Sequence, residues 1–471
     1  MKFKVDNGPH VKDSDNTSRI MNRLMIALIP IICFSVYKNV SIIYRMDISI
    51  LEALKPLFMI LIAIFTSVIT EFLYSLFILK KNKKDLKEYM KHSYAIFPGL
   101  FLALVIPLNT PLLLVSLGAF IATLIGKMIF GGFGHNIFNP ALTGALLVTT
   151  AYGSFISGTS NLFELDTIGS ATPLANLANF NYVGTFEQIV GKFGSIFNYI
   201  FGTIPGTLGE TNKFLILIAF IFLVATKVIK WRIPVFYIST VFVITYIVSL
   251  TNDIGIWYPL FHILSGGLLF GAVFMATDPV TSPITPMGQV LYGIGLGILT
   301  TILRFLTPYP EGVLTSILFM NMTVSLFDKI GLKIRNSFNK KLIYITIFIL
   351  LVISTGFIIN KNLNKDDSSV KILNVIKSED SYVYEMSSKA WGVITANVTI
   401  KDGVVISVDI VNSSSETKWS HIVSNDYINK IINGQDNLDS LDAISGVTIT
   451  SDGLKEMVKK VIEDYGDKYE R

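Results

Sequence analysis

The sequence predicts a polytopic α-helical membrane protein with a small α+β domain at its C-terminal end. Of the 471 residues, 51% are hydrophobic and only 15% are charged, and the mean hydropathy is +0.57. The long apolar runs fall between residues 20 and 360, whereas residues 361–471 have the composition of an ordinary polar domain. Apolar runs of about 20 residues are typical of membrane-spanning helices.

Eleven apolar segments are candidate membrane spans. The third and the fifth are short for a span. Their approximate bounds are 24–41, 55–79, 93–108, 111–131, 141–157, 213–230, 233–250, 258–276, 288–306, 312–328 and 341–360.

Lysine and arginine in short loops predict which side of the membrane each loop occupies. Residues 80–92, 227–232 and 329–341 are rich in these residues and are predicted to be cytoplasmic, which places the N-terminus inside. The loop 158–212 and the C-terminal domain then lie outside. The predicted organisation is a cytoplasmic segment (1–23), a membrane domain (24–330), a membrane anchor (341–360) and an extracytoplasmic domain (361–471).

The first ten candidate spans form two halves of five, and an odd number per half would invert the second half relative to the first. Asn109-Thr110-Pro111 aligns with Thr277-Asp278-Pro279, and GGFGHNIFNPA (131–141) with LTPYPEG (306–312). The expected membrane fold is therefore about ten helices in two inverted five-helix repeats, an arrangement that resembles urea transporters. Ordinary loops between helices are the alternative reading of the aligned segments.

Residues after 361 predict strands followed by helices. Residues 390–411 alternate around Lys401-Asp402-Gly403, and Asp-Gly between alternating segments is a strong hairpin signal. Residues 421–433 predict one helix, and a second helix is predicted to follow with Ser451 as its N-cap. The second helix places five apolar residues on one face: Leu454, Met457, Val458, Val461 and Ile462.

A short motif occurs twice, once in each predicted external region. Residues 166–172 read DTIGSAT and residues 442–448 read DAISGVT. Small residues let the backbone approach a ligand closely, and the second copy precedes a predicted helix, whose N-terminal N–H groups favour a phosphate. Either copy alone would fit a turn that caps a helix. Two copies with the same Asp-to-Thr spacing favour a binding role.

Both motifs resemble the Asp-x-x-Ser-Gly-Ala-Thr site at which an extracytoplasmic flavin transferase links FMN phosphate to threonine. That site occurs in the B and C subunits of the sodium-pumping NADH:quinone reductase and in the D and G subunits of the Rnf complex. Residues 341–471 resemble the G subunit, with one anchor and an external FMN-binding domain. Within about residues 20–330, four segments resemble the D subunit: GGFGHNIFNPAL (131–142), LGETNKF (208–214), FGAVFMATDPVTSP (270–283) and PYPEGVLTSILFMN (308–321).

The resemblance implies that Thr172 and Thr448 each carry FMN through a phosphoester. A non-covalent riboflavin is left open as a further cofactor. The first motif has Gly169 before Ser170 where the family pattern has Ser then Gly, and the second has Val447 in place of Ala. The motif residues expected to accompany the two threonines are Asp166, Ser170, Asp442, Ser445 and Gly446.

Two acidic residues fall within or beside predicted spans. Glu71 lies inside the second span, and Asp278 lies next to a proline-interrupted segment. Charged residues inside membranes are costly and usually face a protein interior, so both are candidates for an ion pathway, with a structural role as the alternative. His135 and His262 lack partners at metal-ligand spacing, and the one cysteine, Cys33, cannot hold an iron–sulfur cluster, which needs four thiolates.

The expected function is that of an electron-transfer subunit of an ion-translocating ferredoxin:NAD oxidoreductase (Rnf) complex in a prokaryotic cell membrane. Electron flow would be coupled to Na⁺ or H⁺ movement, and the chain would not be catalytic alone. The resemblance implies as partners the A, B, C and E subunits of the Rnf complex, a separate G subunit if one exists, the flavin transferase and membrane lipid. The net charge of +5, from 39 basic and 34 acidic residues, is too diffuse for nucleic-acid binding.

Three alternatives remain open. One is an external flavin electron conduit without ion pumping, and another is a urea-transporter-like solute channel. The third is the B subunit of the sodium-pumping quinone reductase, whose long cytoplasmic N-terminal extension has no counterpart in this sequence.

Overall fold

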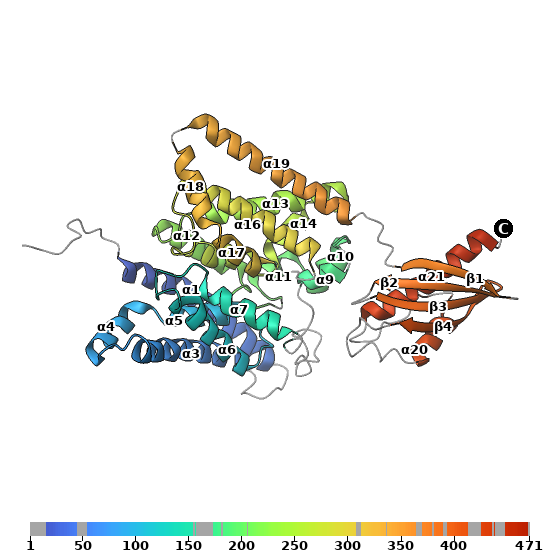
Figure 1. The fold of residues 1–471 in the computed structure, drawn as a ribbon, viewed down its shortest axis with the longest axis horizontal. Coiled ribbons are helices and arrows are strands. Elements are labelled where there is room, and N and C mark those ends of the chain that lie inside the picture. The colour runs from blue at the N-terminus through green and yellow to red at the C-terminus, as the bar shows by residue number, and fades with distance from the viewer. Residues whose placement is uncertain are drawn as a thin grey trace, which may run out of the picture. The chain divides into compact units, whose positions relative to one another are not determined.

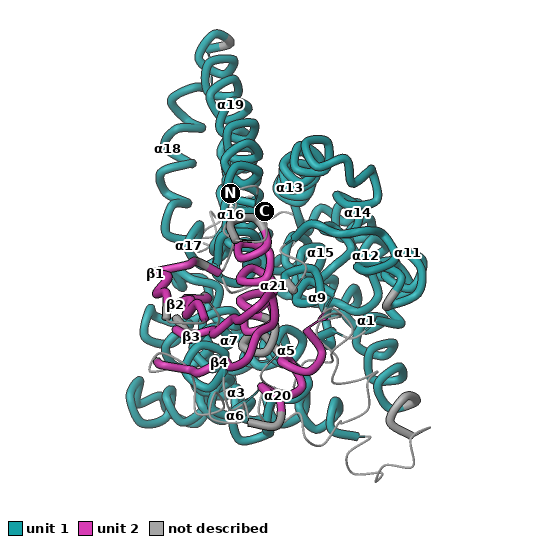
Figure 2. Tube along the Cα trace, turned by 90° about the vertical axis from the view of Figure 1, so that its right-hand side faces the viewer, with its two compact units in different colours: residues 1–364 teal, residues 365–471 magenta. Residues whose placement is uncertain are grey.

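The chain divides into two compact units, Met1–Asn364 and Lys365–Arg471 (Figures 1 and 2). The first unit is built from helices in its described residues, and the second combines a sheet with two helices. The computed structural model describes residues 16–44, 54–153, 156, 173–179, 182–204, 206–307, 312–335, 337–363, 370–378, 381–389, 393–412, 425–435, 438 and 448–469.

The first half of the membrane unit runs from α1 to α7. Pro56 and Pro140 stand in the first turns of α3 and α7, where the missing proline N–H costs nothing because that position has no helical acceptor. The bounds are α1 Thr17–Tyr44, α3 Lys55–Phe77, α4 Lys83–Ser93, α5 Ile96–Val105, α6 Leu112–Thr123, the π-helix η1 Leu124–Met128, and α7 Pro140–Ala151.

Short helices follow in the predicted external loop, and part of that loop packs onto the membrane unit. Leu174 and Leu177 are buried in one cluster with Tyr199, Tyr258 and Phe261. Apolar packing therefore holds this stretch of the loop in place. The bounds are α9 Pro173–Asn179, α10 Phe186–Ile189, η3 Gly191–Phe193 and α11 Ile196–Phe201.

The second half of the membrane unit runs from α12 to α18 and is followed by the long helix α19. Helix α13 packs against α14, α16 and α19. The bounds are α12 Lys213–Ala225, α13 Arg232–Thr251, α14 Trp257–Leu264, α15 Leu268–Phe270, the π-helix η4 Gly271–Met275, α16 Pro286–Leu306, α17 Val313–Asn321, α18 Val324–Ile334 and α19 Phe338–Leu363.

The helices of the first unit have the length and apolarity of a multi-pass membrane protein. Among the described residues, five helices are long and apolar enough to cross a membrane, and up to seven spans result if each of two bent helix pairs counts as one. The five are Thr17–Val40, Lys55–Phe77, Arg232–Thr251, Pro286–Leu306 and Asn339–Leu363.

Each of the eleven predicted segments contains a helix, but several differ from a simple span. Helix α5 has 10 residues, so at ~1.5 Å per residue it covers only about half of a ~30 Å hydrocarbon core. The eighth and tenth segments are broken, with bends of 64° between α14 and α15/η4 and 62° between α17 and α18. Hydropathy does not detect these breaks because the residues on both sides are apolar.

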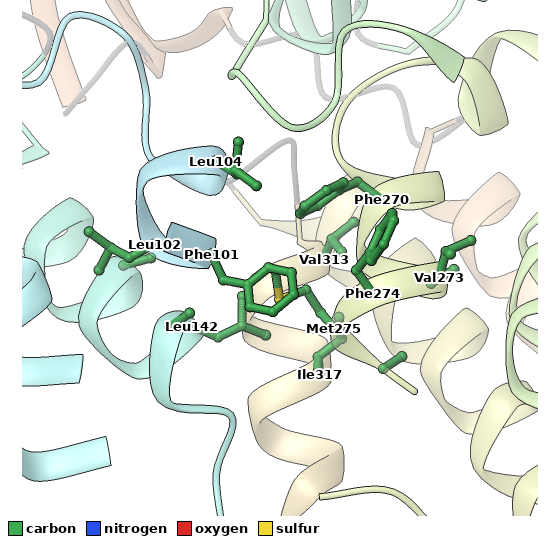
Figure 3. Close-up of a cluster of buried hydrophobic side chains, with 14 of the residues drawn as sticks. Phe101, Leu102, Leu104, Leu142, Phe270, Val273, Phe274, Met275, Val313 and Ile317 are labelled. Atoms are coloured by element: carbon green, nitrogen blue, oxygen red, sulfur yellow. The ribbon is translucent and has the colours of Figure 1, made fainter. Parts of the chain in front are cut away.

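The two halves share one apolar core at the level of these short and broken helices. Figure 3 shows Phe101 of α5 facing Phe270 and Phe274 of α15 and η4, with ring centroids 6.5 and 6.4 Å apart. Leu142 of α7 and Ile317 of α17 belong to the same cluster. The core therefore holds α5 and α7 of the first half against the broken helices of the second half.

A glycine sets the spacing between α3 and α5. A Cβ atom at Gly99 would lie 2.1 Å from the Ala63 carbonyl oxygen, closer than any real side-chain contact. Small residues allow helices in membranes to approach in this way. Gly99 therefore fixes α5 directly against α3.

The second unit is a four-stranded antiparallel meander in the order β1-β2-β3-β4. Its core joins apolar residues of the sheet to Leu454, Met457, Val458 and Val461 of the last helix, which confirms the predicted helix face. The bounds are β1 Val370–Ser378, β2 Ser381–Lys389, β3 Val393–Lys401, β4 Val404–Asn412, α20 Asn425–Asn433 and α21 Thr448–Tyr469.

The predicted hairpin and helices of this unit are present, with one correction. Asp402 and Gly403 connect β3 to β4 with φ of +49° and +78°, as a two-residue turn of the favoured hairpin type requires. The prediction of Ser451 as an N-cap is wrong, because α21 begins at Thr448. Apolar periodicity starts only at Leu454, the first core residue, so it misses the helical turn before it.

Candidate functional site

Glu71, a predicted ion-pathway residue, forms a buried ion pair. Its Oε2 accepts a hydrogen bond from the Lys127 ammonium at 2.7 Å, and the two side chains are 0% and 3% exposed. Lys127 also donates to the Ser93 carbonyl oxygen at 2.5 Å. Burial and the Glu71 charge raise the pKa of Tyr89 to about 12, so the Tyr89 hydroxyl stays protonated and donates to Glu71 Oε1 at 3.4 Å.

Lys127 is a buried charged residue that the sequence analysis did not single out. It lies in the π-helix η1 at the end of α6, inside the predicted span 111–131. A lone lysine in an apolar segment is the signal that would have found it, because a buried charge needs a partner. π-helical turns within α-helices occur frequently at functional sites.

Asp278, the second predicted ion-pathway residue, lies between η4 and α16 and faces a pocket of about 80 Å³. Thr281 Oγ1 donates to its Oδ2 at 3.0 Å, and the Asn136 side chain also hydrogen bonds to the carboxylate. Lys127 lines the same pocket. The structure therefore brings Asp278 and Lys127 to one pocket. Glu71 binds the Lys127 ammonium but is not one of the residues that line this pocket.

The pocket is lined mainly by apolar side chains with a few polar groups, and its volume of about 80 Å³ is small beside the roughly 300–1,000 Å³ of typical ligand pockets. Asn136, Asn139 and Thr277 add hydrogen-bonding groups to the wall, and apolar walls with a few placed polar groups are typical of ligand pockets. Five aromatic rings line it: Tyr94, Phe97, Phe101, Phe133 and Phe274.

Asn139 links the two halves of the membrane unit beside this pocket. Its side chain accepts from the Leu142 N–H and so caps α7, while its own backbone N–H donates to Asn321 Oδ1 at 3.1 Å. The Asn321 side chain in turn donates to the Thr281 carbonyl oxygen at 2.9 Å. This chain of buried amides fixes the pocket wall across the boundary between the halves.

A second group of buried cations lies at the break between α14 and α15. Arg304 is 0% exposed and donates to the carbonyl oxygens of His262 at 2.6 Å and Ser265 at 3.4 Å. Lys213 donates to the Gly266 carbonyl oxygen at 2.7 Å. Carbonyls that the broken helix leaves without N–H partners are thus satisfied by side chains, as a membrane interior demands.

The structure describes little of the predicted flavin-attachment residues. Thr172, Asp166, Ser170, Asp442, Ser445 and Gly446 all lie outside the described residues. Helix α9 begins at Pro173, directly after Thr172 in sequence, and α21 begins at Thr448 itself. Thr448 therefore stands at a helix N-terminus, where backbone N–H groups and the helix dipole favour a phosphate.

The first turns of α21 also cover an unsatisfied polar atom. Ser388 Oγ on β2 is buried and has no hydrogen-bond partner in the described structure. A Cβ at Gly453 would lie 2.8 Å from this oxygen, so the helix and strand approach closely here.

Comparison with known proteins places the membrane unit in a family. Residues 4–335 match the NQR2, RnfD, RnfE family. The chain belongs to this family. Residues 390–463 match the FMN-binding domain, a range that contains β3, β4, α20 and Thr448. The NQR2, RnfD, RnfE region and the FMN-binding domain flank α19.

Relatives of the NQR2, RnfD, RnfE family that resemble this chain are components of ion-translocating oxidoreductase complexes. The D subunit of the proton-translocating ferredoxin:NAD(+) oxidoreductase complex of Clostridium ljungdahlii is 35% identical over 69% of this chain and 94% of the relative. The D subunit of the Na(+)-translocating ferredoxin:NAD(+) oxidoreductase complex of Acetobacterium woodii is 32% identical over 70% and 93%. The B subunit of the Na(+)-translocating NADH-quinone reductase of Chromohalobacter salexigens is 37% identical over 51% and 59%.

Proposed function

We propose that this chain is the D subunit of an ion-translocating ferredoxin:NAD oxidoreductase complex, joined to an FMN-binding domain of the G-subunit type. The observation that carries the proposal is the presence of both matches in one chain, at residues 4–335 and 390–463. The other members of the complex would be its partners. The names of the two D-subunit relatives specify different ions, so either Na⁺ or H⁺ fits the proposal.

The proposal includes FMN bound covalently at Thr172 and Thr448 by a flavin transferase on the outer side of the membrane. Bound FMN supplies one- and two-electron transfer. For the second site, the support is the position of Thr448 at the start of α21. For the first site, the support is the packing of α9, which directly follows Thr172 in sequence. Its residues Leu174 and Leu177 are buried in the membrane unit. Asp166, Ser170, Asp442, Ser445 and Gly446 would shape the two attachment sites.

The membrane domain (24–330) would contain the ion pathway, with Glu71 and Asp278 as its carboxylates. The inverted arrangement of two five-helix repeats, like that of urea transporters, is part of this proposal. It is supported by the half-length helix α5 and the broken α14/α15 pair, since discontinuous helices form ion sites in transporters. A non-covalent riboflavin stays part of the proposal without an assigned site, because the pocket beside Asp278 has a volume of only about 80 Å³, well below the roughly 300–1,000 Å³ of typical ligand pockets.

Replacement of each threonine tests the flavin sites. Thr172→Ala and Thr448→Ala should each remove about half of the covalent flavin fluorescence in a denaturing gel, and the double variant should remove all of it. Mass spectrometry of the wild-type peptides should place one FMN on each threonine. Full fluorescence in the double variant would reject both attachment sites.

A flavin electron conduit without ion pumping is the second candidate function. It is favoured by the ion pair at Glu71, whose carboxylate already has a cation partner. Sealed vesicles that contain the complete complex separate the two functions, because a conduit would transfer electrons without any uptake of Na⁺ or H⁺.

A further inference from the structure

The ammonium of Lys127 occupies a site made of oxygen atoms. Glu71 Oε2 lies 2.7 Å from Lys127 Nζ and the Ser93 carbonyl oxygen lies 2.5 Å from it. Ser93 ends α4 and is followed by Tyr94 in the left-handed region, with φ of +53°, so its carbonyl lies where the helix is interrupted. Carboxylates and the carbonyls of interrupted helices are the groups that bind monovalent cations in transporters.

Lys127 can leave this site without entering lipid. It lines the pocket of about 80 Å³, and a single water needs only about 10–15 Å³ of such space. Asp278, from the other half of the molecule, faces the same pocket. The lysine therefore has space beside it and a second carboxylate in the lining of the same pocket.

The buried group formed by Glu71, Asp278 and Lys127 can accommodate one more positive charge. When Asp278 is ionised, Glu71 and Asp278 carry two negative charges and Lys127 carries one positive charge. A buried group of this kind is stabilised when its charges balance. One additional monovalent cation would balance them, and it would bind where the lysine ammonium now lies.

We propose that Glu71 Oε2 and the Ser93 carbonyl oxygen form a Na⁺ site for which Lys127 competes. When the cation binds, the lysine moves into the pocket toward Asp278, and when the lysine returns, the cation is expelled. The Lys127 ammonium and a free Na⁺ ion thus occupy the same oxygen site in turn. This inference rests on the proposed ion pathway. It makes Lys127, which lies in η1, the residue that controls cation binding in that pathway.

The break between α14 and α15 shows the contrasting arrangement. There the buried cation is Arg304, which holds the carbonyl oxygens of His262 and Ser265 together. An arginine presents a rigid fork of donors, whereas a lysine is a single charge on a flexible stem. A flexible lysine side chain can therefore leave the oxygen site and return to it more readily than an arginine side chain could.

Na⁺ titration of the purified, flavinylated full-length protein tests the site itself. Melting temperatures are compared in NaCl and choline chloride at equal ionic strength and mildly alkaline pH, where protons compete less. Lys127→Met should show a saturable, Na⁺-specific rise in Tm of about 3 °C or more, because bound ligand stabilises the folded state. The wild type should respond less, since Na⁺ must displace the lysine. Equal responses of Lys127→Met to Na⁺ and choline would overturn the proposal.

Two further variants keep the test decisive. The double variant Glu71→Gln/Lys127→Met removes the carboxylate, so its Tm should no longer distinguish Na⁺ from choline; a retained difference would place the site elsewhere. If Lys127→Met does not fold, Lys127→Arg is used in the assembled complex. Arginine binds a carboxylate through two parallel hydrogen bonds and stays protonated, so ion uptake in sealed vesicles should fall about tenfold or more with both flavins retained.

The results distinguish this inference from the proposed function. Wild-type ion uptake by Lys127→Arg would overturn the competition while leaving ion pumping intact. Absence of ion uptake by the wild-type complex would overturn the proposed coupling, and the Na⁺ titration of the isolated chain would still decide whether the site exists.

Discussion

At the scale of single residues, the ion pair between Glu71 and Lys127 depends on both members. Each is almost fully buried, so removing one leaves the other as an uncompensated charge in a medium of low dielectric. Removing one partner of a buried pair typically costs about 3–5 kcal/mol, whereas replacing both by neutral groups is often tolerated. The stability of this membrane unit should therefore respond very differently to single and double substitutions here.

We expect Glu71→Gln alone to lower the free energy of unfolding by about 3–5 kcal/mol because it leaves the Lys127 ammonium without its counter-ion. The double variant Glu71→Gln/Lys127→Met should recover most of that loss. Thermal or denaturant unfolding of the purified proteins measures both effects. Losses that simply add in the double variant would show that the two side chains do not interact energetically.

The sequence identified one member of this pair and missed the other. A glutamate in an apolar segment is costly and usually faces a protein interior, and this predicts Glu71 as a candidate for the ion pathway without indicating its partner. The partner lies 56 residues away, in another helix, and helical periodicity relates only residues a few positions apart. Asp278 was likewise identified, but its shared pocket with Lys127 depends on the packing of the two halves.

At the scale of helices, α5 is the element that most constrains its neighbours. It is only 10 residues long, and it lies against α3 through Gly99 and against the second half through Phe101. Because the backbone of α3 stands where a Gly99 side chain would be, even one methyl group must push the two helices apart. Closely packed interiors do not absorb such a shift without loss.

Gly99→Ala should therefore destabilise the protein by about 1–3 kcal/mol, the usual range for overpacking. Gly153→Ala is the matched control, because a Cβ at Gly153 would meet nothing within 4 Å. Melting temperatures of the two purified variants measure the difference. Equal melting temperatures would show that α3 and α5 can separate at no cost.

The existence of the helices was predictable from hydropathy, but their interruptions were not. The eighth predicted span contains Ser265-Gly266-Gly267, a local turn signal that a hydropathy window does not weigh, and Gly266, with φ of +64°, turns the chain between α14 and α15. Arg304 and Lys213 from other helices hold carbonyl oxygens of this turn, and these tertiary contacts cannot be read from the local sequence. The Asp402-Gly403 hairpin was predictable because its signal is entirely local.

At the scale of the whole molecule, one chain combines two units that each have their own core. The family match ends at residue 335 and the FMN-binding match begins at residue 390. Between them lies α19, an apolar helix long enough to cross a membrane. The order of the domains and the family could be predicted from sequence motifs. The flavin sites remain predictions because most of their residues lie outside the described ranges.

Labelling of single cysteines tests the predicted orientation. In a Cys33→Ser background, a cysteine at Asn161 or Asp436 should react with an impermeant reagent added to intact cells, because both positions are predicted to be external. A cysteine at Lys84 should react only after the cells are permeabilised. The opposite pattern would place the C-terminal domain in the cytoplasm and rule out attachment of FMN by an extracytoplasmic transferase.

The wide turn that carries Lys127 has a consequence for the history of the family. In η1 the Ile129 N–H bonds to the Leu124 carbonyl oxygen at 3.0 Å, five residues back, so this turn holds one residue more than an α-helix would. Loss of that residue would restore an α-helix and rotate the flanking side chains by about 100° relative to each other. The lysine could then no longer face α3. Among descendants of a common ancestor, a one-residue gap at this position and the disappearance of the acid corresponding to Glu71 are expected to have been inherited together.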